Sequence, residues 1–333
     1  MGPIGTETIF RLLTPIANTV ASPFATLSKT PMGALQGTVD YRLASEITTP
    51  LGPDATNDFI ARAVEIGGPC LMARFGSTEL RLVLRHHGRK TRNRLEKFYA
   101  LFSRLESPWW VPWEHQNIRK KSGFYPVSKD TTDRFVDLMM SSMEQLDLLA
   151  SWVQGENKIA HRFPEATVTT LEHFNQLQRG DLWTKKLKGK KVLVIHPFEE
   201  SIRAQYKKRH LLHEDPELLP EFDLKIVKSV QSLGTPPPEF ASWFEGLEHM
   251  YSESQKVDYD VALIAAGAYS LPLASKLKDA GRTVLVLGGS LQLLFGIMGK
   301  RWDSSSLYNE HWVRPLSIEK PDGFKGADGG AYW

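Results

Sequence analysis

Apolar runs of strand length alternate with helix-like segments through the C-terminal half of the chain. Residues 261–265 form one such run, residues 271–280 carry apolar side chains at helical spacing, and residues 283–287 form a second run. Two further strands are predicted earlier, at residues 191–195 and 224–230. Strands separated by helices pair in parallel, because each helix carries the chain back to the starting end of the sheet. The pattern predicts a Rossmann-like α/β fold, with a mostly parallel sheet flanked by helices.

The N-terminal half carries fewer strand signals and more helical ones. Residues 57–66 have helical spacing, and two glycines and a proline separate them from an apolar run at residues 70–75. Apolar side chains recur at helical spacing over residues 131–152 and predict one long helix there.

The length of 333 residues exceeds the usual size of one domain, although α/β domains with insertions reach it. We expect an N-terminal arm, partly irregular, over residues 1–54. A single Rossmann-like domain is expected over residues 55–333, with helical additions in the form of an insertion at about residues 85–180.

The charges of the chain nearly cancel. Lysine and arginine number 41 against 38 aspartate and glutamate residues, so the bulk positive charge that attracts proteins to nucleic acid is missing. The basic run at residues 85–104, which is interleaved with aromatic residues, is more typical of a helix with one solvated face than of a single-strand binding surface. We therefore expect no nucleic-acid partner.

The single cysteine, Cys70, lies in an apolar run and is expected to be a buried strand residue. One cysteine cannot form an intrachain disulfide or a thiolate metal cluster, which favours a reducing compartment. No segment approaches the ~20 continuous apolar residues of a membrane span, and the N-terminus lacks the charged start of a secretory signal. These features predict a cytoplasmic protein.

Residues 9–35 qualify that expectation, because Arg11 and Lys29 are the only charged residues in a stretch with many apolar side chains. Such a segment can make a peripheral contact with a membrane, which would place the protein at the inner face of the bilayer. Three prolines in the stretch argue against one long amphipathic helix and favour a flexible arm or an oligomer contact.

The first candidate site lies where the run at residues 70–75 turns into a helix. Arg74 can neutralise a diphosphate, Gly76 lets a ligand approach the backbone, and Glu79 can hold a divalent cation or act as a base. Helix capping by Ser77 and a favourable first-turn charge at Glu79 are the structural alternative. That alternative does not explain an arginine at a strand end.

A second candidate site follows the run at residues 191–195. His196 can form a hydrogen bond with a phosphate or a sugar, and a carboxylate such as Glu200 can deprotonate an acceptor hydroxyl. A histidine at a strand end is often a structural residue, but the carboxyl edge of a parallel sheet is where ligands bind, which favours function.

The third candidate site is the turn Gly288-Gly289-Ser290, which follows the last predicted strand and opens a helix. A glycine turn before a helix exposes backbone N–H groups to a phosphate, although such turns also close ordinary βα units. Lys300 and Arg301 come a short helix later and can add positive charge to the site. Alternatively, they are solvent-exposed cations at a helix end, where the helix dipole favours positive charge.

Together the three segments resemble the glycosyltransferases of the GT-D fold, a family of bacterial nucleotide-sugar enzymes. The resemblance covers residues 55–302, and its last block is the most specific. The residues that carry it are Arg74-Phe75-Gly76-Ser77-Thr78-Glu79, Lys191-Val192-Leu193-Val194-Ile195-His196-Pro197-Phe198 with Ser201-Ile202 and Gln205-Tyr206, and Gly288-Gly289-Ser290 with Gln292, Phe295-Gly296 and Gly299-Lys300-Arg301-Trp302.

In that family an Asp-X-Glu motif after Arg-Phe-Gly is associated with a divalent cation, Mn²⁺ or Mg²⁺, and with the donor diphosphate. Glu79 matches the Glu of this motif, whereas Ser77 replaces its Asp. A serine hydroxyl is a poor ligand for these ions beside a carboxylate, which puts the metal in doubt. Arg74, Lys300 and Arg301 would then carry more of the leaving-group charge.

The resemblance implies a hexosyltransferase of polysaccharide biosynthesis, which moves a sugar from a nucleoside diphosphate sugar to a hydroxyl of a surface glycan or glycolipid. Uridine diphosphate (UDP) sugars are the expected donors. The residues expected to bind the donor are Arg74, Gly76, Ser77, Gly288, Gly289, Ser290, Gln292, Lys300 and Arg301. Glu79 is expected to contact the metal or the sugar, and His196 or Glu200 the acceptor.

Two other classes of protein are compatible with the same sheet. A nucleotide-binding or scaffold protein that has lost catalysis is the main alternative, and Ser77 would then mark that loss. A methyltransferase is the second, but the chain lacks an acidic residue at a strand end together with the glycine-rich first loop that such sites use.

Overall fold

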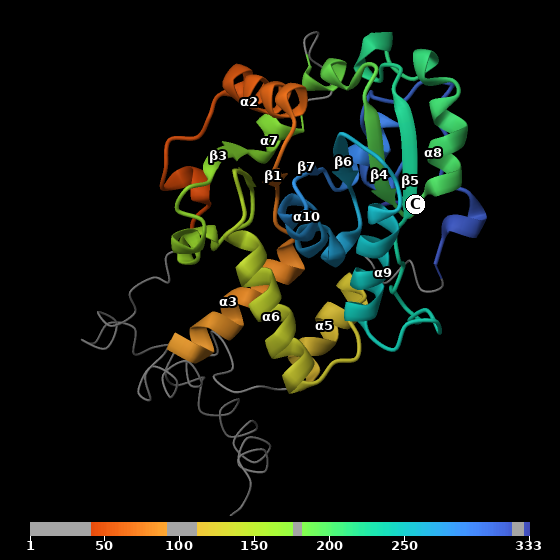
Figure 1. Cartoon of the computed structure of the whole chain (residues 1–333). Helices are drawn as coiled ribbons and strands as arrows, with labels where there is room; N and C mark the ends of the chain where they lie inside the picture. Colours follow the sequence, from red (N-terminus) through yellow and green to blue (C-terminus); the bar gives the residue numbers. More distant parts are fainter. Residues whose placement is uncertain (1–40, 92–111, 176–181, 322–329) are drawn as a thin grey trace, which may run out of the picture.

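Seven parallel strands form one sheet in the computed structural model, which describes residues 41–91, 112–175, 182–321 and 330–333. The strands are β1 Cys70–Ala73, β2 Leu148–Ser151, β3 Thr167–Thr170, β4 Lys191–His196, β5 Asp223–Lys228, β6 Val261–Ile264 and β7 Thr283–Val286. Their order across the sheet is β3-β2-β1-β7-β6-β4-β5 (Figure 1), and every described pairing is parallel. The predicted Rossmann-like α/β fold is therefore confirmed.

The last strand in the chain occupies the centre of the sheet. β7 pairs with β1 through Cys70 and Thr283, and through Met72 and Leu285, and it pairs with β6 on its other side. It therefore joins the strands of the N-terminal half to those of the C-terminal half.

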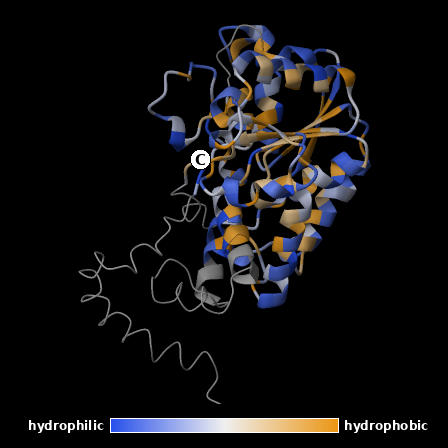
Figure 2. Ribbon diagram, turned by 90° about the vertical axis from the view of Figure 1, so that its left-hand side faces the viewer, coloured by the Kyte–Doolittle hydropathy of each residue, from blue (hydrophilic) through white to orange (hydrophobic). Residues whose placement is uncertain are grey.

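Helices cover both faces of this sheet. They are α2 Pro53–Ile66, α3 Ser77–Thr91, α5 Pro112–Ser122, α6 Lys129–Met143, α7 Leu171–Phe174, α8 Glu199–Tyr206, α9 Trp243–Gln255, α10 Ser270–Asp279 and α11 Gly289–Leu294. Buried side chains of α3, α5, α6, α9 and α10 form one apolar cluster, and those of α2, α7, α8 and α11 form another. Figure 2 shows the apolar strands enclosed between these helical layers.

Alternation along the strands explains the two clusters. In β4, Leu193 and Ile195 pack into the first cluster, whereas Val192 and Val194 pack into the second. Successive side chains of a strand point to opposite faces, so a strand covered on both sides is apolar throughout. Residues 192–195 of this strand are therefore all apolar.

The long helix predicted over residues 131–152 is wrong in its C-terminal part. Helix α6 ends at Met143, and residues Leu148–Ser151 form strand β2, which is buried along its whole length between β1 and β3. A short buried strand and a buried helix segment have the same apolar composition, so spacing alone does not separate them. Strand β3 was not predicted. The region expected to be a helical insertion, at about residues 85–180, thus supplies two strands of the sheet.

Cys70 departs in part from its prediction. It lies in a strand, as expected, but at the partly exposed start of β1 rather than in the buried interior. Burial, followed by the nearby charge of Asp147, raises the pKa of the thiol to about 12.

The predicted N-terminal arm lies outside the described residues up to residue 40, as does most of the basic run at residues 85–104. Residues 41–52 pack on the body of the protein, where Ala44 is buried and Leu51 forms a bridge with Thr169. Within the described ranges, no helix is long and apolar enough to cross a membrane.

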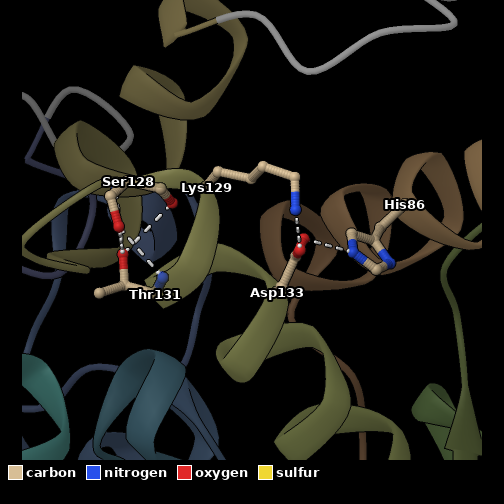
Figure 3. A network of polar contacts seen from close by, with 5 residues as sticks. All are labelled: His86, Ser128, Lys129, Thr131 and Asp133. Atoms are coloured by element: carbon tan, nitrogen blue, oxygen red, sulfur yellow. Dashed lines mark hydrogen bonds and ion pairs between the residues drawn. The ribbon is translucent and has the colours of Figure 1, made fainter.

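A polar network joins α3 to α6 (Figure 3). Nε2 of His86, on α3, lies 2.7 Å from Oδ1 of Asp133, on α6, and Lys129 donates to the other carboxylate oxygen at 2.7 Å. The Ser128 hydroxyl caps α6 by accepting a hydrogen bond from the backbone N–H of Thr131. Burial raises the pKa of Asp133, but the hydrogen bonds from Lys129 and His86 outweigh it, so the pKa falls below 3.8.

The substitution Asp133→Asn should lower the free energy of unfolding at pH 7 by about 1 kcal/mol, because an amide accepts these hydrogen bonds less strongly than a carboxylate. A carboxyl group with a lowered native pKa stabilises the fold above its unfolded pKa and loses this effect as the pH falls through the native value. The deficit of the variant should therefore shrink below pH 3.8. Urea denaturation of both proteins at several pH values measures this difference in unfolding free energy. A difference that does not change with pH would contradict the role given to the Asp133 carboxylate.

Candidate functional site

A cavity of about 430 Å³ lies at the carboxyl edge of the sheet. Because all the strands are parallel, the loops that follow them meet at this edge, which is where ligands bind in open α/β sheets. Residues that follow each of the seven strands line the cavity: Arg74 after β1, Trp152 after β2, Leu171 after β3, Pro197 after β4, Ser229 after β5, Ala265 after β6 and Leu287 after β7.

The side chain of Arg74 lies against the backbone of Gly288 in the cavity wall. Strand β1 is followed by α3 on one face of the sheet, and its neighbour β7 is followed by α11 on the other face, which opens a crevice between the two loops. Gly288 has a φ of +58°, and a Cβ at this position would lie 2.1 Å from Nη2 of Arg74. Only glycine fits here, both for its backbone conformation and for the space that it leaves.

Further contacts hold the Arg74 side chain. Its Nη1 donates to the backbone oxygen of Phe75 at 3.2 Å, and its Cζ lies 5.5 Å from the centre of the Trp152 ring. The Trp152 indole N–H donates to that same backbone oxygen at 2.8 Å. Trp152, which was not predicted as a site residue, therefore helps to position the guanidinium.

Glu79 lies in the first turn of α3 and lines the same cavity as Arg74. Its side chain is 8% exposed, and a Cβ at Gly76 would lie 1.9 Å from Oε2, so the carboxylate folds back over the Gly76 backbone. Among the residues that the structure describes, Glu79 is the only aspartate or glutamate that lines the cavity. The structure gives its carboxylate no hydrogen bond or ion pair with any described residue, so it is available to a ligand. Ser77, the first residue of α3, lines the same wall.

The chemistry of a metal site is only partly present. Among the described residues, no group of three or more His, Cys, Asp or Glu side chains lies close enough together to hold a metal ion. In nucleotide sites, Mg²⁺ is held by one or two carboxylates together with substrate phosphates. At this cavity, a divalent cation would therefore depend on Glu79 and on phosphate oxygens of the ligand.

Arg301 lies on another wall of the cavity, against the C-terminal residues. Its Cζ lies 4.9 Å from the centre of the Tyr332 ring, and its Nη1 donates to the Tyr332 hydroxyl at 3.3 Å. Its backbone N–H donates to the carbonyl oxygen of Ala331 at 3.0 Å. Trp302 packs on Gly289, where a Cβ would lie 2.6 Å from the indole ring.

Apart from Lys300, the remaining residues predicted at and after the glycine turn lie in the cavity wall, with different surroundings. Gly289 and Ser290 line it at the start of α11. Gln292 also lines it, but its amide nitrogen donates to the backbone oxygens of Ile297 and Tyr332, at 3.3 and 3.2 Å. Gln292 thus organises the backbone around the turn.

Three further predicted residues differ in their positions. His196 is 3% exposed and lines the cavity. Glu200 and Lys300 are exposed, and neither is among the residues that line the cavity. Glu200 lies in the first turn of α8, so its proximity in sequence to His196 does not bring it to the same wall.

Two buried carboxylates that the sequence prediction missed support the walls. Glu156 accepts hydrogen bonds from the backbone N–H groups of Ala44, Trp152 and Val153, at 3.0, 3.1 and 3.0 Å. It fixes the loop that carries Trp152. It also accepts a hydrogen bond from the Ser151 hydroxyl. No spacing or motif marks Glu156 in the sequence, because three of these four partners are backbone groups.

Glu319 anchors the C-terminal segment in the same way. Its carboxylate accepts hydrogen bonds from the hydroxyl and the backbone N–H of Ser201, and from the backbone N–H of Leu316. Its carbonyl oxygen accepts from the indole N–H of Trp333 at 3.4 Å. Tyr332 and Trp333 both line the cavity, and the only sequence signal for them is an aromatic pair far from the other motifs.

Comparisons with known proteins add little to this geometry. No protein-family model matches the chain, and no curated protein matches it. Among solved structures, the chain is similar to one described as the selenomethionine-substituted structure of domain of unknown function 1792. The two are 11% identical, with a TM-score of 0.35, and the match covers 79% of this chain and 96% of the other.

The substitution Glu319→Gln should loosen residues 330–333 without unfolding the sheet, because the amide loses at least one acceptor for the hydrogen bonds of Ser201. Hydrogen bonds to charged groups contribute about 1.5–3 kcal/mol, so amide exchange in these residues should speed up about ten-fold or more. Hydrogen exchange with mass spectrometry measures it. The exposed Glu310, changed to Gln, is the control, and equal exchange in the two variants would contradict the anchoring role.

Proposed function

We propose that this protein is a glycosyltransferase that moves a sugar from a nucleoside diphosphate sugar to a hydroxyl of a glycan or glycolipid. UDP sugars are the donors that we propose first. The observation that carries the proposal is the position of Arg74 against Gly288, at the crevice between β1 and β7, with Arg301 in the same cavity. Two guanidinium groups at this point of a parallel sheet suit a diphosphate.

The charge of the cavity supports an anionic ligand. Arg74, Lys121 and Arg301 line it, and Glu79 is the single aspartate or glutamate among the described lining residues. Guanidinium groups bind phosphate oxygens through paired hydrogen bonds, which are about twice as strong as neutral ones. The cavity volume of about 430 Å³ falls within the usual range for sites of small ligands.

The proposed reaction uses these groups at different atoms. The bond between the anomeric carbon of the sugar and the diphosphate oxygen breaks, and the electron pair leaves on the diphosphate. Arg74 and Arg301 stabilise that negative charge. The acceptor hydroxyl oxygen bonds to the anomeric carbon and loses its proton, and Glu79 is the carboxylate available to contact the sugar or to take that proton.

A nucleotide-binding or scaffold protein without catalysis is the second candidate. The observation that favours it is Ser77, which lies in the cavity wall where the resembled family has an aspartate. An assay of sugar transfer and donor hydrolysis, with and without Mn²⁺, separates the two. Turnover of any nucleotide sugar supports the enzyme, whereas tight UDP binding without turnover supports the scaffold.

The substitutions Arg74→Ala and Arg301→Ala should each weaken UDP binding about ten-fold or more, because each removes charged hydrogen bonds to phosphate. Isothermal titration calorimetry measures this loss. Arg203→Ala is the matched control, because Arg203 lies outside the cavity lining and pairs with Glu199 on α8. Affinities for UDP that are unchanged in both cavity variants would remove the basis of the proposal.

The substitution Gly288→Ala tests the crevice by a different route. The new methyl group would meet Arg74 and push its guanidinium away, so UDP affinity should fall by about the same factor as in Arg74→Ala. The control is Gly281→Ala, whose φ is +83° and whose Cβ would meet nothing within 4 Å. Both variants place an alanine at a positive φ and carry backbone strain of about 1–3 kcal/mol, visible as a lower melting temperature. If Gly281→Ala lost UDP affinity to the same degree, strain rather than contact would be the cause.

A further inference from the structure

The backbone fixes the protonation of one ring nitrogen of His196. The N–H of Phe198 lies 3.0 Å from Nδ1 of His196. A backbone amide can only donate a hydrogen bond, so Nδ1 must be the acceptor and carries no proton. In a neutral imidazole, the single proton is then on Nε2.

The surroundings of the ring keep it neutral. His196 is the last residue of β4, its side chain is 3% exposed, and its ring packs 4.8 Å from that of Phe198. Burial lowers the pKa of His196 to about 3, and no charged group from any neighbouring element contributes to this shift. A protonated ring would also place a second N–H against that of Phe198, which the geometry at Nδ1 opposes.

The other nitrogen is left for a ligand. The structure gives Nε2 of His196 no hydrogen bond to any described residue, although the side chain lines the cavity together with Arg74 and Glu79. Nε2 is not among the fully buried side-chain atoms of the described residues that lack a partner, so it opens on the cavity, where an oxygen of a ligand can accept its hydrogen bond.

We propose that His196 is a fixed hydrogen-bond donor, which binds an acceptor oxygen of the ligand through Nε2–H and does not accept a proton in the reaction. The identity of the ligand rests on the proposed function, whereas the tautomer does not. The acceptor oxygen belongs either to the diphosphate or to a sugar hydroxyl.

This assignment changes the expected division of roles. The sequence placed His196 among the residues that serve the acceptor, where a base is needed. With Nε2 as a donor, Glu79 is the only Asp, Glu or His side chain among the described lining residues that can take up a proton. His196 then favours ligands that place a hydrogen-bond acceptor oxygen next to Nε2–H.

The tautomer is measured by NMR on the free protein with ¹⁵N-labelled histidine. The chain has 10 histidines, and the signals of His196 are assigned by their loss in His196→Gln. We expect a proton on Nε2, and no titration between about pH 5 and 8. A proton on Nδ1, or a charged ring within that range, would overturn the proposal.

The donor role is measured by affinity for a UDP sugar, for UDP and for inorganic pyrophosphate. His196→Phe removes the N–H and should weaken binding of the UDP sugar about ten-fold or more, whereas His196→Gln offers an amide N–H near the same place and should recover most of the loss. Circular dichroism checks that both variants fold. Equal losses in the two variants would contradict a donor role.

Two further comparisons complete the test. If pyrophosphate binding falls in parallel with UDP binding, the partner oxygen is on the diphosphate. If only binding of the intact nucleotide sugar falls, the oxygen is on the sugar. The ratio of wild-type to His196→Phe affinity should be the same at about pH 6 and 8, since titration of the ligand affects both proteins alike. A ratio that changes with pH would show that the histidine titrates.

Different binding results would overturn the donor role of His196 and the proposed function. If UDP and a UDP sugar both bind and shift other cavity signals but leave Nε2–H of His196 unmoved, the glycosyltransferase proposal stands and the donor role is wrong. If no nucleotide or nucleotide sugar binds, the proposed function fails, and an Nε2–H tautomer in the free protein would still agree with the backbone geometry.

Discussion

The pairing of β1 with β7 is the constraint on which the rest of the structure depends. It is the only contact between strands that joins the β1–β3 half of the described sheet to the β4–β7 half, and it links residues more than two hundred positions apart in the chain. The same pairing brings the loop that carries Arg74 against the loop that carries Gly288. Fold and candidate site therefore depend on one set of backbone hydrogen bonds, and the cavity exists only in the complete sheet.

The charged groups of the cavity are held in place by close packing against the backbone of its walls. Arg74 lies on the Gly288 backbone and Glu79 on that of Gly76, so glycines bring a cation and a carboxylate against the main chain. The supporting residues act at a distance from the ligand. Glu156 fixes the loop of Trp152, and Glu319 ties the C-terminal segment, whose Tyr332 contacts Arg301. A site built on such contacts is preorganised, because little side-chain freedom remains to be lost on binding.

The sequence correctly predicted the features that depend on local apolar patterns and on the parallel order of the strands. Strands β6 and β7 were found as apolar runs. Arg74, His196 and Gly288 were each placed at the carboxyl end of a strand, where ligands bind in parallel sheets, and the family resemblance joined their three segments. Strand β2 was mistaken for helix, since its identity depends on backbone partners in β1 and β3. Glu319 and Tyr332 act through residues distant in sequence, which no local pattern records. Glu200 was assigned by proximity to His196, but its position on α8 leaves it exposed.

The most direct test is a crystal structure of the protein with UDP bound. The account predicts diphosphate density at the crevice between β1 and β7, with phosphate oxygens within hydrogen-bond distance of the guanidinium groups of Arg74 and Arg301. Nucleotide density on another surface, or an empty crevice in crystals soaked far above the dissociation constant measured in solution, would contradict it.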